Sequence, residues 1–293
     1  MTETPRTLME FLNASRDYLK AKGIENARGD AEALLGLALK LPRIQLYVQH
    51  DRLLKPAEIS AFRELLARRG KREPLQLIIG EVEFCGIKIS VSPGLLIPRL
   101  ETEELAEAAI EWAQAQGNRP LRALDIGTGT GCLAIALASH VPNMIVDAVD
   151  VDFEALKCSA SNAARHSLEG RVNLLAGDVM SERFLESVRP PYDVVISNPP
   201  YVSEEDFHSL PPEVRLHESR AALVATNHGM AFYYRVIELA SSLLKPGALL
   251  AVEVGYDQAR EVADVFRSGF EQVLVKHDLS GVARIVCGFA RKE

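Results

Sequence analysis

The tetrapeptide Asn198-Pro199-Pro200-Tyr201 combines groups that could hold a planar nitrogen for attack. The lone pair of an amide nitrogen is delocalised, so such a nitrogen is a poor nucleophile. Two acceptors aimed at its hydrogens, the Asn198 side-chain oxygen and the Pro199 carbonyl, could favour an attacking geometry. The prolines fix φ, and Tyr201 offers a flat aromatic face. We therefore predict that Asn198, Pro199 and Tyr201 are catalytic and that Pro200 completes the substrate-binding residues. The alternative is a proline-rich turn after a strand.

A glycine-rich loop, Asp125-Ile-Gly-Thr-Gly-Thr-Gly131, follows a predicted strand and opens a predicted helix. Glycines allow tight turning and a close approach of a ligand to the backbone. A dinucleotide fingerprint would need Gly or Ala where Cys132 stands. The pattern D-x-G-x-G-x-G instead resembles the first motif of class I methyltransferases. That resemblance implies an S-adenosylmethionine site formed by Gly127, Thr128, Gly129, Thr130 and Gly131. The alternative is a strand–turn–helix without a ligand.

Acidic residues at two later strand ends fit the same cofactor. Asp150 ends the next predicted strand, where a carboxylate can accept hydrogen bonds from both ribose hydroxyls. Asp152 is a competitor, but it better suits the cap of the following helix. The turn Gly177-Asp178-Val179 follows the third strand, and in class I methyltransferases this turn flanks the adenine. The resemblance implies contacts from Asp178 or from the Val179 backbone, with a plain turn residue as the alternative for Asp178.

Strands and helices alternate in the part of the chain that carries these motifs. The pattern predicts strands at 121–125, 145–150, 172–175, 193–197 and 248–254, and helices at 101–116, 130–140, 152–166 and 229–244. Such alternation is typical of a parallel sheet with helices on both faces. Two more strands, 271–276 and 284–289, have a short connection, so at least one terminal strand is antiparallel. We predict an α/β domain, residues 99–293, with a seven-stranded, mostly parallel sheet.

The first third of the chain has a different pattern. Apolar residues recur at helical spacing in three stretches of residues 1–72, which predicts a small helical bundle. Residues 73–98 contain short strand-like runs at 77–79, 82–84 and 87–91, separated by glycines. We therefore predict an N-terminal helical domain, 1–72, joined to the α/β domain by a β-hairpin linker, 73–98.

Composition and charge exclude several classes of protein. No apolar run reaches 18 residues and no signal peptide is visible, so we expect a cytoplasmic protein without a membrane span. The four cysteines form no CxxC pair and the histidines form no zinc-type spacing, so we expect free, mostly buried thiols and no metal site. Residues 1–97 carry a net charge of +3 and the remainder −10. An acidic catalytic half argues against stable nucleic-acid binding and suits a protein substrate.

Nearly the whole chain resembles the HemK/PrmC family, protein-glutamine N5-methyltransferases that act on class I peptide-chain release factors. Besides the two motifs above, the resemblance is carried by Leu96–Glu103, Leu216–Leu223, Glu253–Gln258, and Asp278–Gly281 with Arg284. It implies a class I, Rossmann-like methyltransferase fold in which the glycine loop, Asp150, Val179 and Asn198 contact S-adenosylmethionine. It also implies that residues 198–201 hold the glutamine of a release factor's Gly-Gly-Gln tip, while the N-terminal domain grips the factor elsewhere. Because the sulfonium is already activated, we expect no essential general base.

Some residues depart from the family pattern or keep two interpretations. Leu100 and Ser219 stand where the family prefers proline, and His217 stands where an aromatic residue is usual, which leaves room for a different protein target. The basic run 68–72 is either a solvated helix end or a contact for an acidic partner or RNA. Arg99 either faces the cofactor or pairs with Glu101 or Glu103.

Two rival functions remain open at the level of sequence. A nucleic-acid methyltransferase acting on adenine N6 or guanine N2 could use the same tetrapeptide, because those amines are also planar, but it should carry a basic groove. A non-catalytic protein of the same fold is the other rival. Titration with S-adenosylmethionine would identify it, and the intact motifs argue against it. We expect a monomer, since no assembly motif is visible.

Overall fold

The computed structural model describes residues 7–292 in two compact units. Unit 1 comprises the chain up to Gly80 together with Pro212–His217, and unit 2 comprises Glu81–Pro211 and Glu218 onward. Residues 1–6, which the predicted N-terminal domain includes, and residue 293 lie outside the described residues. In the part of the chain that is described, no helix is long and apolar enough to cross a membrane.

Unit 1 is the expected helical bundle. Its helices are α1 (Leu8–Ala21), α2 (Ala27–Leu39), α3 (Arg43–Val48), α4 (Pro56–Gly70), α5 (Leu75–Ile79) and α10 (Pro212–His217). Thr7 and Glu10 form a capping box that starts α1, and Asn26 caps α2. The apolar faces of these helices meet in one core, in which Leu12, Leu34 and Phe62 have no exposed surface.

A buried ion network holds α10 in unit 1. Arg69 donates to Asp30 Oδ2 at 2.7 Å and to Glu213 Oε1 at 3.1 Å, and its side chain is only 9% exposed. Arg72 donates to the other Glu213 oxygen at 2.7 Å and to the Gly23 carbonyl at 2.6 Å. Neither interpretation of the basic run 68–72 describes Arg69, because this arginine is buried and paired inside the unit.

The predicted hairpin forms, but the run before it is a helix. Strand β1 (Glu81–Phe84) pairs antiparallel with β2 (Ile87–Ser90) around the two-residue turn Cys85-Gly86. Both turn residues have positive φ, as a type I′ turn requires. The strand expected at 77–79 is wrong, since these residues end α5. The residues of the predicted linker therefore fall in both units.

Unit 2 is built on a seven-stranded sheet. Its strands are β3 (Leu121–Ile126), β4 (Met144–Asp150), β5 (Val172–Ala176), β6 (Tyr192–Ser197), β7 (Leu244–Glu253), β8 (Gln272–His277) and β9 (Ala283–Phe289). Their order is β5-β4-β3-β6-β7-β9-β8. Neighbours from β5 to β7 are parallel, and β9 runs antiparallel to both of its neighbours. The mostly parallel sheet predicted from the sequence is confirmed.

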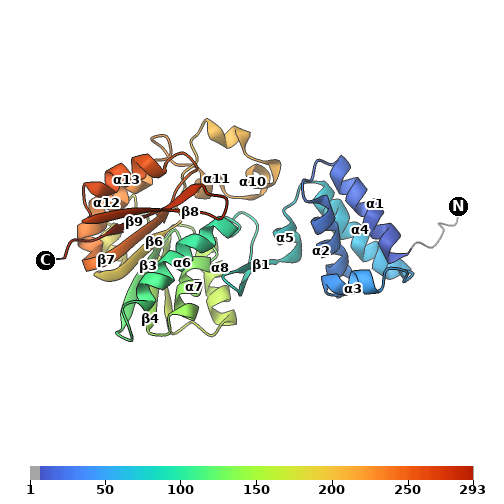
Figure 1. Ribbon diagram of the computed structural model, residues 1–293, viewed down its shortest axis with the longest axis horizontal. Coiled ribbons are helices and arrows are strands. Elements are labelled where there is room, and N and C mark those ends of the chain that lie inside the picture. Colours follow the sequence, from blue (N-terminus) through green and yellow to red (C-terminus); the bar gives the residue numbers. More distant parts are fainter. Residues whose placement is uncertain (1–6, 293) are drawn as a thin grey trace. The chain divides into compact units, whose positions relative to one another are not determined.

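Helices cover both faces of the sheet (Figure 1). They are α6 (Leu100–Gln114), α7 (Cys132–His140), α8 (Phe153–Arg165), α9 (Phe184–Ser187), α11 (Arg220–Leu223), α12 (Ala231–Leu243) and α13 (Ala259–Arg267), with the 3-10 turn η1 (Asp206–Ser209). Helices α6 to α8 pack on one face, and α12 and α13 pack on the other. Helices α9, α11 and α13 were not predicted from the sequence.

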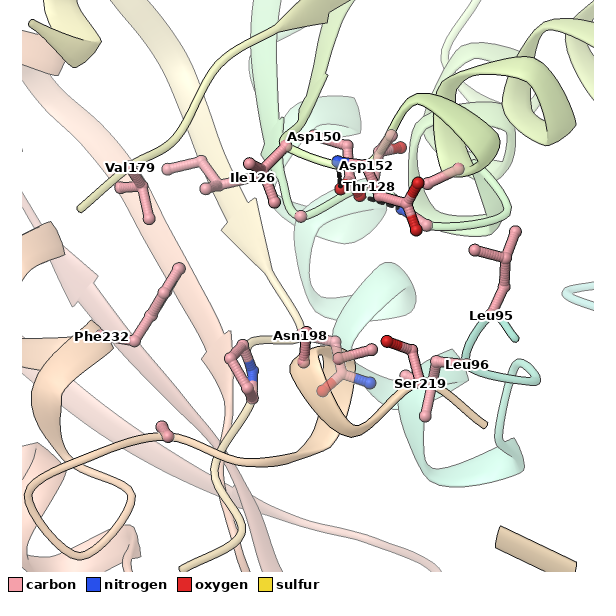
Figure 2. Close-up of a pocket in the computed structure, with 18 of the residues that line it drawn as sticks. Leu95, Leu96, Ile126, Thr128, Asp150, Asp152, Val179, Asn198, Ser219 and Phe232 are labelled. Atoms are coloured by element: carbon pink, nitrogen blue, oxygen red, sulfur yellow. Dashed lines mark hydrogen bonds between the residues drawn. The ribbon is translucent and has the colours of Figure 1, made fainter. Parts of the chain in front are cut away.

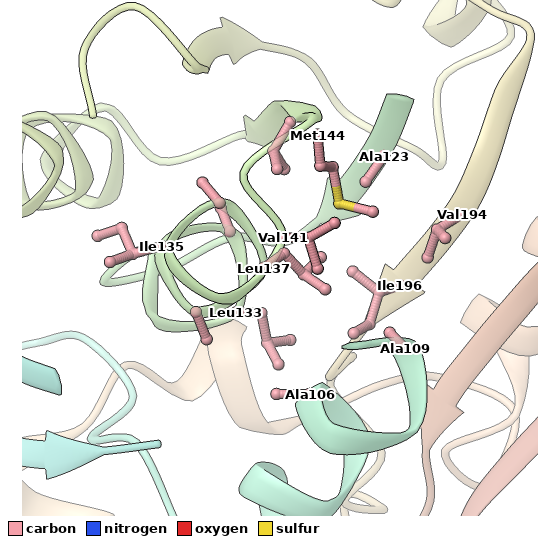
Figure 3. Packing of buried hydrophobic residues seen from close by; sticks show 14 of the residues in the cluster. Ala106, Ala109, Ala123, Leu133, Ile135, Leu137, Val141, Met144, Val194 and Ile196 are labelled. Carbon is pink, nitrogen blue, oxygen red and sulfur yellow. The ribbon is translucent and has the colours of Figure 1, made fainter. Parts of the chain in front are cut away.

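Successive side chains of each strand point to opposite faces of the sheet, so a separate hydrophobic core forms on each face. In β3, Ala123 faces the α6–α7 layer, whereas Leu124 faces the layer of α12 and α13. Figure 3 shows the first core, where Ala106 and Ala109 of α6 allow the helix to lie close to Ile196 of β6. The thiols of Cys132, Cys158 and Cys287 are free and buried, and that of Cys85 is free and partly buried, as expected.

Replacing Arg69 tests the ion network of unit 1. We expect Arg69→Ala to lower the free energy of unfolding by about 3 kcal/mol, because Asp30 would stay buried without a cation. Arg16→Ala is the control, since Arg16 forms an exposed pair with Asp17 that should contribute close to zero. Urea unfolding followed by circular dichroism measures both. Equal losses for the two variants would contradict a stabilising role of the network.

Candidate active site

The carboxyl ends of four parallel strands line one cavity in unit 2. The sheet reverses its strand order between β3 and β6, and in such sheets ligands bind outside the carboxyl ends at this switch point. A cavity of about 390 Å³ lies there, within the range that holds a small-molecule ligand. Figure 2 shows Asp150 and Asn198 on opposite sides of it. The two sequence motifs therefore face the same space.

The glycine loop wraps the end of β3 with little side-chain bulk. A Cβ added to Gly127 or Gly129 would meet no atom within 4 Å, so both glycines border open space. A Cβ on Gly131 would lie 2.4 Å from Ser159 Oγ, so this glycine serves helix packing instead. Gly129 has a φ of +56° and lines the cavity, whereas Gly131 does not. The loop is thus a backbone cradle that a side chain would fill.

The Asp125 carboxylate holds this loop in place through two hydrogen bonds. Its Oδ2 accepts hydrogen bonds from Thr128 Oγ1 at 2.6 Å and from the Ala134 amide at 3.2 Å. Asp125 has no exposed surface, and burial raises the pKa of its carboxyl to about 7. It does not line the cavity. The structure therefore gives Asp125 a supporting role and leaves Thr128 and Thr130 as buried lining residues.

Asp150 and Asp152 have different roles at the end of β4. The Asp150 carboxylate accepts from the Gly129 amide and from the Asp152 amide, each at 2.9 Å. These bonds fix it on the cavity wall. Asp152 accepts from the Glu154 amide and caps α8, which confirms the sequence interpretation. Asp152 also lines the cavity.

The turn after β5 forms the next part of the wall. Asp178 is exposed, lines the cavity and accepts from the Met180 amide, so it is a turn residue that still faces the site. Val179 is buried, and its carbonyl accepts from Arg235 Nε at 3.0 Å. Phe232 of α12 adds an aromatic side chain to the lining.

A chain of hydrogen bonds holds Asn198. Its Nδ2 donates to Thr102 Oγ1 at 3.1 Å, and the Thr102 hydroxyl donates to Glu253 Oε2 at 2.6 Å. The Tyr201 hydroxyl donates to the other carboxylate oxygen at 3.2 Å. Glu253 is 2% exposed, and burial raises its pKa to about 7. Asn198 Oδ1 is also buried and accepts no hydrogen bond from the described residues.

Arg99 has a partner that the sequence did not suggest. Its guanidinium donates to Glu218 Oε1 at 2.5 Å, not to Glu101 or Glu103. The Glu218 side chain is 1% exposed, and burial raises the pKa of its carboxyl. Ser219, the next residue, starts α11 and lines the cavity. Ser219 and Leu100 both replace a proline of the family pattern, but only Ser219 lines the cavity. Leu100 is 78% exposed and lies outside the lining.

The charges of the lining suit a cationic ligand. Among the described residues that line the cavity, Asp150, Asp152 and Asp178 are carboxylates, and none is Lys, Arg or His. A phosphate-bearing dinucleotide would meet repulsion here, whereas a sulfonium and an α-amino group would be attracted. Together with the open cradle at Gly127 and Gly129, this acidic lining fits S-adenosylmethionine.

Most of the predicted site residues line this cavity. They are Gly127, Thr128, Gly129, Thr130, Asp150, Asp178, Val179, Asn198 and Pro200. Gly131, Pro199 and Tyr201 are not among the lining residues, and the Tyr201 hydroxyl faces Glu253. Thr102 and Glu253 also belong to the site, although the sequence did not predict them there. Both lie in segments that carry the family resemblance, but no local pattern connects them to Asn198. No group of possible metal ligands occurs in residues 7–292.

Comparison with protein families finds two matches. The model of the PrmC N-terminal domain matches residues 10–80, and that of the methyltransferase small domain matches residues 108–229. These ranges fall on the helical bundle and on the segment from α6 to the loop before α12.

Individual relatives match over nearly the full length. The release factor glutamine methyltransferase of Geobacter sulfurreducens is 42% identical over 98% of this chain and 99% of its own. The enzyme of the same name from Chlorobaculum tepidum is 38% identical over 95% of each chain. The crystal structure of a methyltransferase from Pyrococcus furiosus has a TM-score of 0.50 at 20% identity, covering 71% of this chain and 90% of its own. This structural match shows the methyltransferase fold.

Adding a methyl group at Gly129 should block cofactor binding. In Gly129→Ala the new Cβ enters the cavity, so we expect the dissociation constant for S-adenosylmethionine to rise by more than about tenfold. Gly117→Ala is the matched control, because Gly117 also has positive φ and open surroundings but does not line the cavity. Both variants should lose about 1 kcal/mol of stability. Isothermal titration measures the affinity of each variant for S-adenosylmethionine. Equal affinities would contradict the role of Gly129 as part of a backbone cradle for the cofactor.

The buried Asp125 should make stability depend on pH. Its folded-state pKa of about 7 lies above its ordinary value of 3.8, so the folded state holds the proton more tightly than the unfolded state. The wild-type chain should therefore lose stability relative to Asp125→Asn as pH rises between these values, by about 1 kcal/mol per pH unit. Urea unfolding of both proteins at a series of pH values measures this difference. A difference that does not vary with pH would show that folding does not raise the pKa of Asp125.

Proposed function

Because this chain belongs to the family of release factor glutamine methyltransferases, we propose that it methylates a glutamine side chain of class I peptide-chain release factors. The methyl group goes from S-adenosylmethionine to N5 of the glutamine in the Gly-Gly-Gln motif. The observation that carries this proposal is Asn198 Oδ1, a buried acceptor on the wall of the cofactor cavity that has no hydrogen-bond partner among residues 7–292. An acceptor in that state is suited to a substrate N–H.

Different parts of the cavity wall are proposed to bind different parts of the cofactor. The amides and small side chains of the glycine loop would accommodate its amino-acid part, and Asp150 would accept from the ribose hydroxyls. Asp178 and the backbone of Val179 would flank the adenine. The sulfonium supplies an activated methyl group when the cofactor is bound, and the three carboxylates of the lining favour its positive charge.

The tetrapeptide positions the glutamine amide. Asn198 Oδ1 accepts one N–H, and the Pro199 carbonyl accepts the other, so the nitrogen lone pair is directed toward the methyl group. Pro200 and Tyr201 complete this part of the site. As the bond from the amide nitrogen to the methyl group forms, the bond from the methyl group to sulfur breaks. Positive charge passes from sulfur to the amide, which then loses a proton to solvent. No general base has to act before the attack, and the proposal includes none.

Unit 1 is proposed to bind the body of the release factor. This binding role is supported by the match of residues 10–80 to the PrmC N-terminal domain and by the net positive charge of residues 1–97. The enzyme would act as a monomer, without a stable nucleic-acid complex, and in the cytoplasm, where translation ends.

A methylation assay with mapped product tests this function. Incubation with S-adenosylmethionine and a class I release factor should increase the mass of the Gly-Gly-Gln peptide by one methylene, as seen by mass spectrometry. A release factor with this glutamine replaced by alanine should gain nothing. Asn198→Ala should lower kcat by at least about 100-fold, because it removes an acceptor that orients the nucleophile.

The same assay separates this function from its rival. Titration of Asn198→Ala with S-adenosylmethionine checks that the variant still folds and binds the cofactor. Methyl transfer to RNA or DNA without transfer to the release factor would overturn the proposal in favour of a nucleic-acid methyltransferase.

A further inference from the structure

We propose that Glu253 is a positioning residue that acts through Thr102 and Tyr201 to decide which end of the Asn198 amide faces the substrate. This inference rests on the proposed function, because it concerns how the same site holds the glutamine. It is carried by the direction of the hydrogen bonds that join these four side chains.

The direction starts at Glu253, whose pKa is raised to about 7 by burial. In its ionised form, which predominates above that pH, the carboxylate can only accept hydrogen bonds. Thr102 has a single hydroxyl hydrogen, and it is used in the 2.6 Å bond to Glu253 Oε2. Thr102 Oγ1 can then only accept from its other neighbour, Asn198. Asn198 must present its NH₂ to Thr102, so its Oδ1 is left for the cavity.

A second branch holds the other end of the tetrapeptide. The Tyr201 hydroxyl donates to Glu253 Oε1 at 3.2 Å, so one carboxylate anchors both Asn198 and Tyr201. Glu253 itself is fixed, since it ends β7 and pairs with Ile285 of β9. Its backbone carbonyl also accepts from the Tyr233 hydroxyl at 2.9 Å. The anchor is therefore part of the sheet and not of a loop.

If the direction of these hydrogen bonds were reversed, the side-chain amide of Asn198 would turn around. In Glu253→Gln the new NH₂ group could donate to Thr102 Oγ1, which would free the threonine hydroxyl to donate to Asn198 Oδ1. The asparagine would then direct its NH₂ into the cavity, where it would repel the N–H of the substrate glutamine. Such a variant should lose more in catalysis than in cofactor binding.

Kinetics with matched variants test the inference. We expect Glu253→Gln and Thr102→Val to lower kcat for the release factor by about 10- to 100-fold. Thr102 and Asn198 also line the cofactor cavity, so the dissociation constant for S-adenosylmethionine should change as well, but by less than kcat does. Thr102→Ser keeps the hydroxyl and should recover most of the wild-type kcat. A residue that only stabilises the fold would change the melting temperature without this separation of kcat from cofactor binding.

A second readout does not depend on catalysis. The side-chain NH₂ signals of Asn198 can be assigned in a ¹⁵N spectrum by their absence in Asn198→Asp. They should move in Glu253→Gln and Thr102→Val and return near their wild-type positions in Thr102→Ser. Unchanged NH₂ signals in the first two variants, or wild-type kcat in Glu253→Gln, would overturn the inference. If the wild-type enzyme methylates no release factor, the proposed function fails, while the NH₂ signals still decide the role of Glu253.

Discussion

The carboxyl ends of parallel strands must meet at one edge of a sheet, and the active site depends on this constraint. The glycine loop follows β3, Asp150 ends β4, the turn at Asp178 follows β5, and Asn198 follows β6. Residues that are far apart in the sequence therefore reach one cavity, and hydrogen bonds such as that from Gly129 to Asp150 then fix them there. The two hydrophobic cores on either side of the sheet fix the strands, and through them the distances between these groups.

Several polar atoms near this edge lack a partner. Buried oxygens of Asp125, Thr130, Asn198 and Glu218 accept or donate no hydrogen bond within the described chain. Each such group destabilises the folded state by about 1–3 kcal/mol, so the cores must offset this cost. Burial also raises the pKa values of Asp125 and Glu253 to about 7. The site thus keeps polar groups in a state that favours binding of a ligand over maximal stability.

The sequence predicted the features that are set by local pattern. Periodicity was sufficient for the seven strands, and the glycines and the asparagine of the two motifs were recognisable where they stand. Periodicity failed for α5, because a short apolar run such as Leu75–Ile79 has no period that distinguishes a helix from a strand. The partners of Arg69 and Arg99 could not be predicted, since Glu213 and Glu218 lie more than a hundred residues away. Thr102 and Glu253 were missed as site residues for the same reason, because only the folded sheet brings them to Asn198.

Helix α10 has a consequence for how the chain is synthesised. It packs in unit 1, yet it is encoded between β6 and α12, so Glu213 follows Arg69 by 144 residues. When the first eighty residues leave the ribosome, Arg69 can pair only with Asp30. At common elongation rates the second carboxylate arrives on the order of ten seconds later. The helical unit therefore gains its last helix only after four strands of the catalytic sheet have been made.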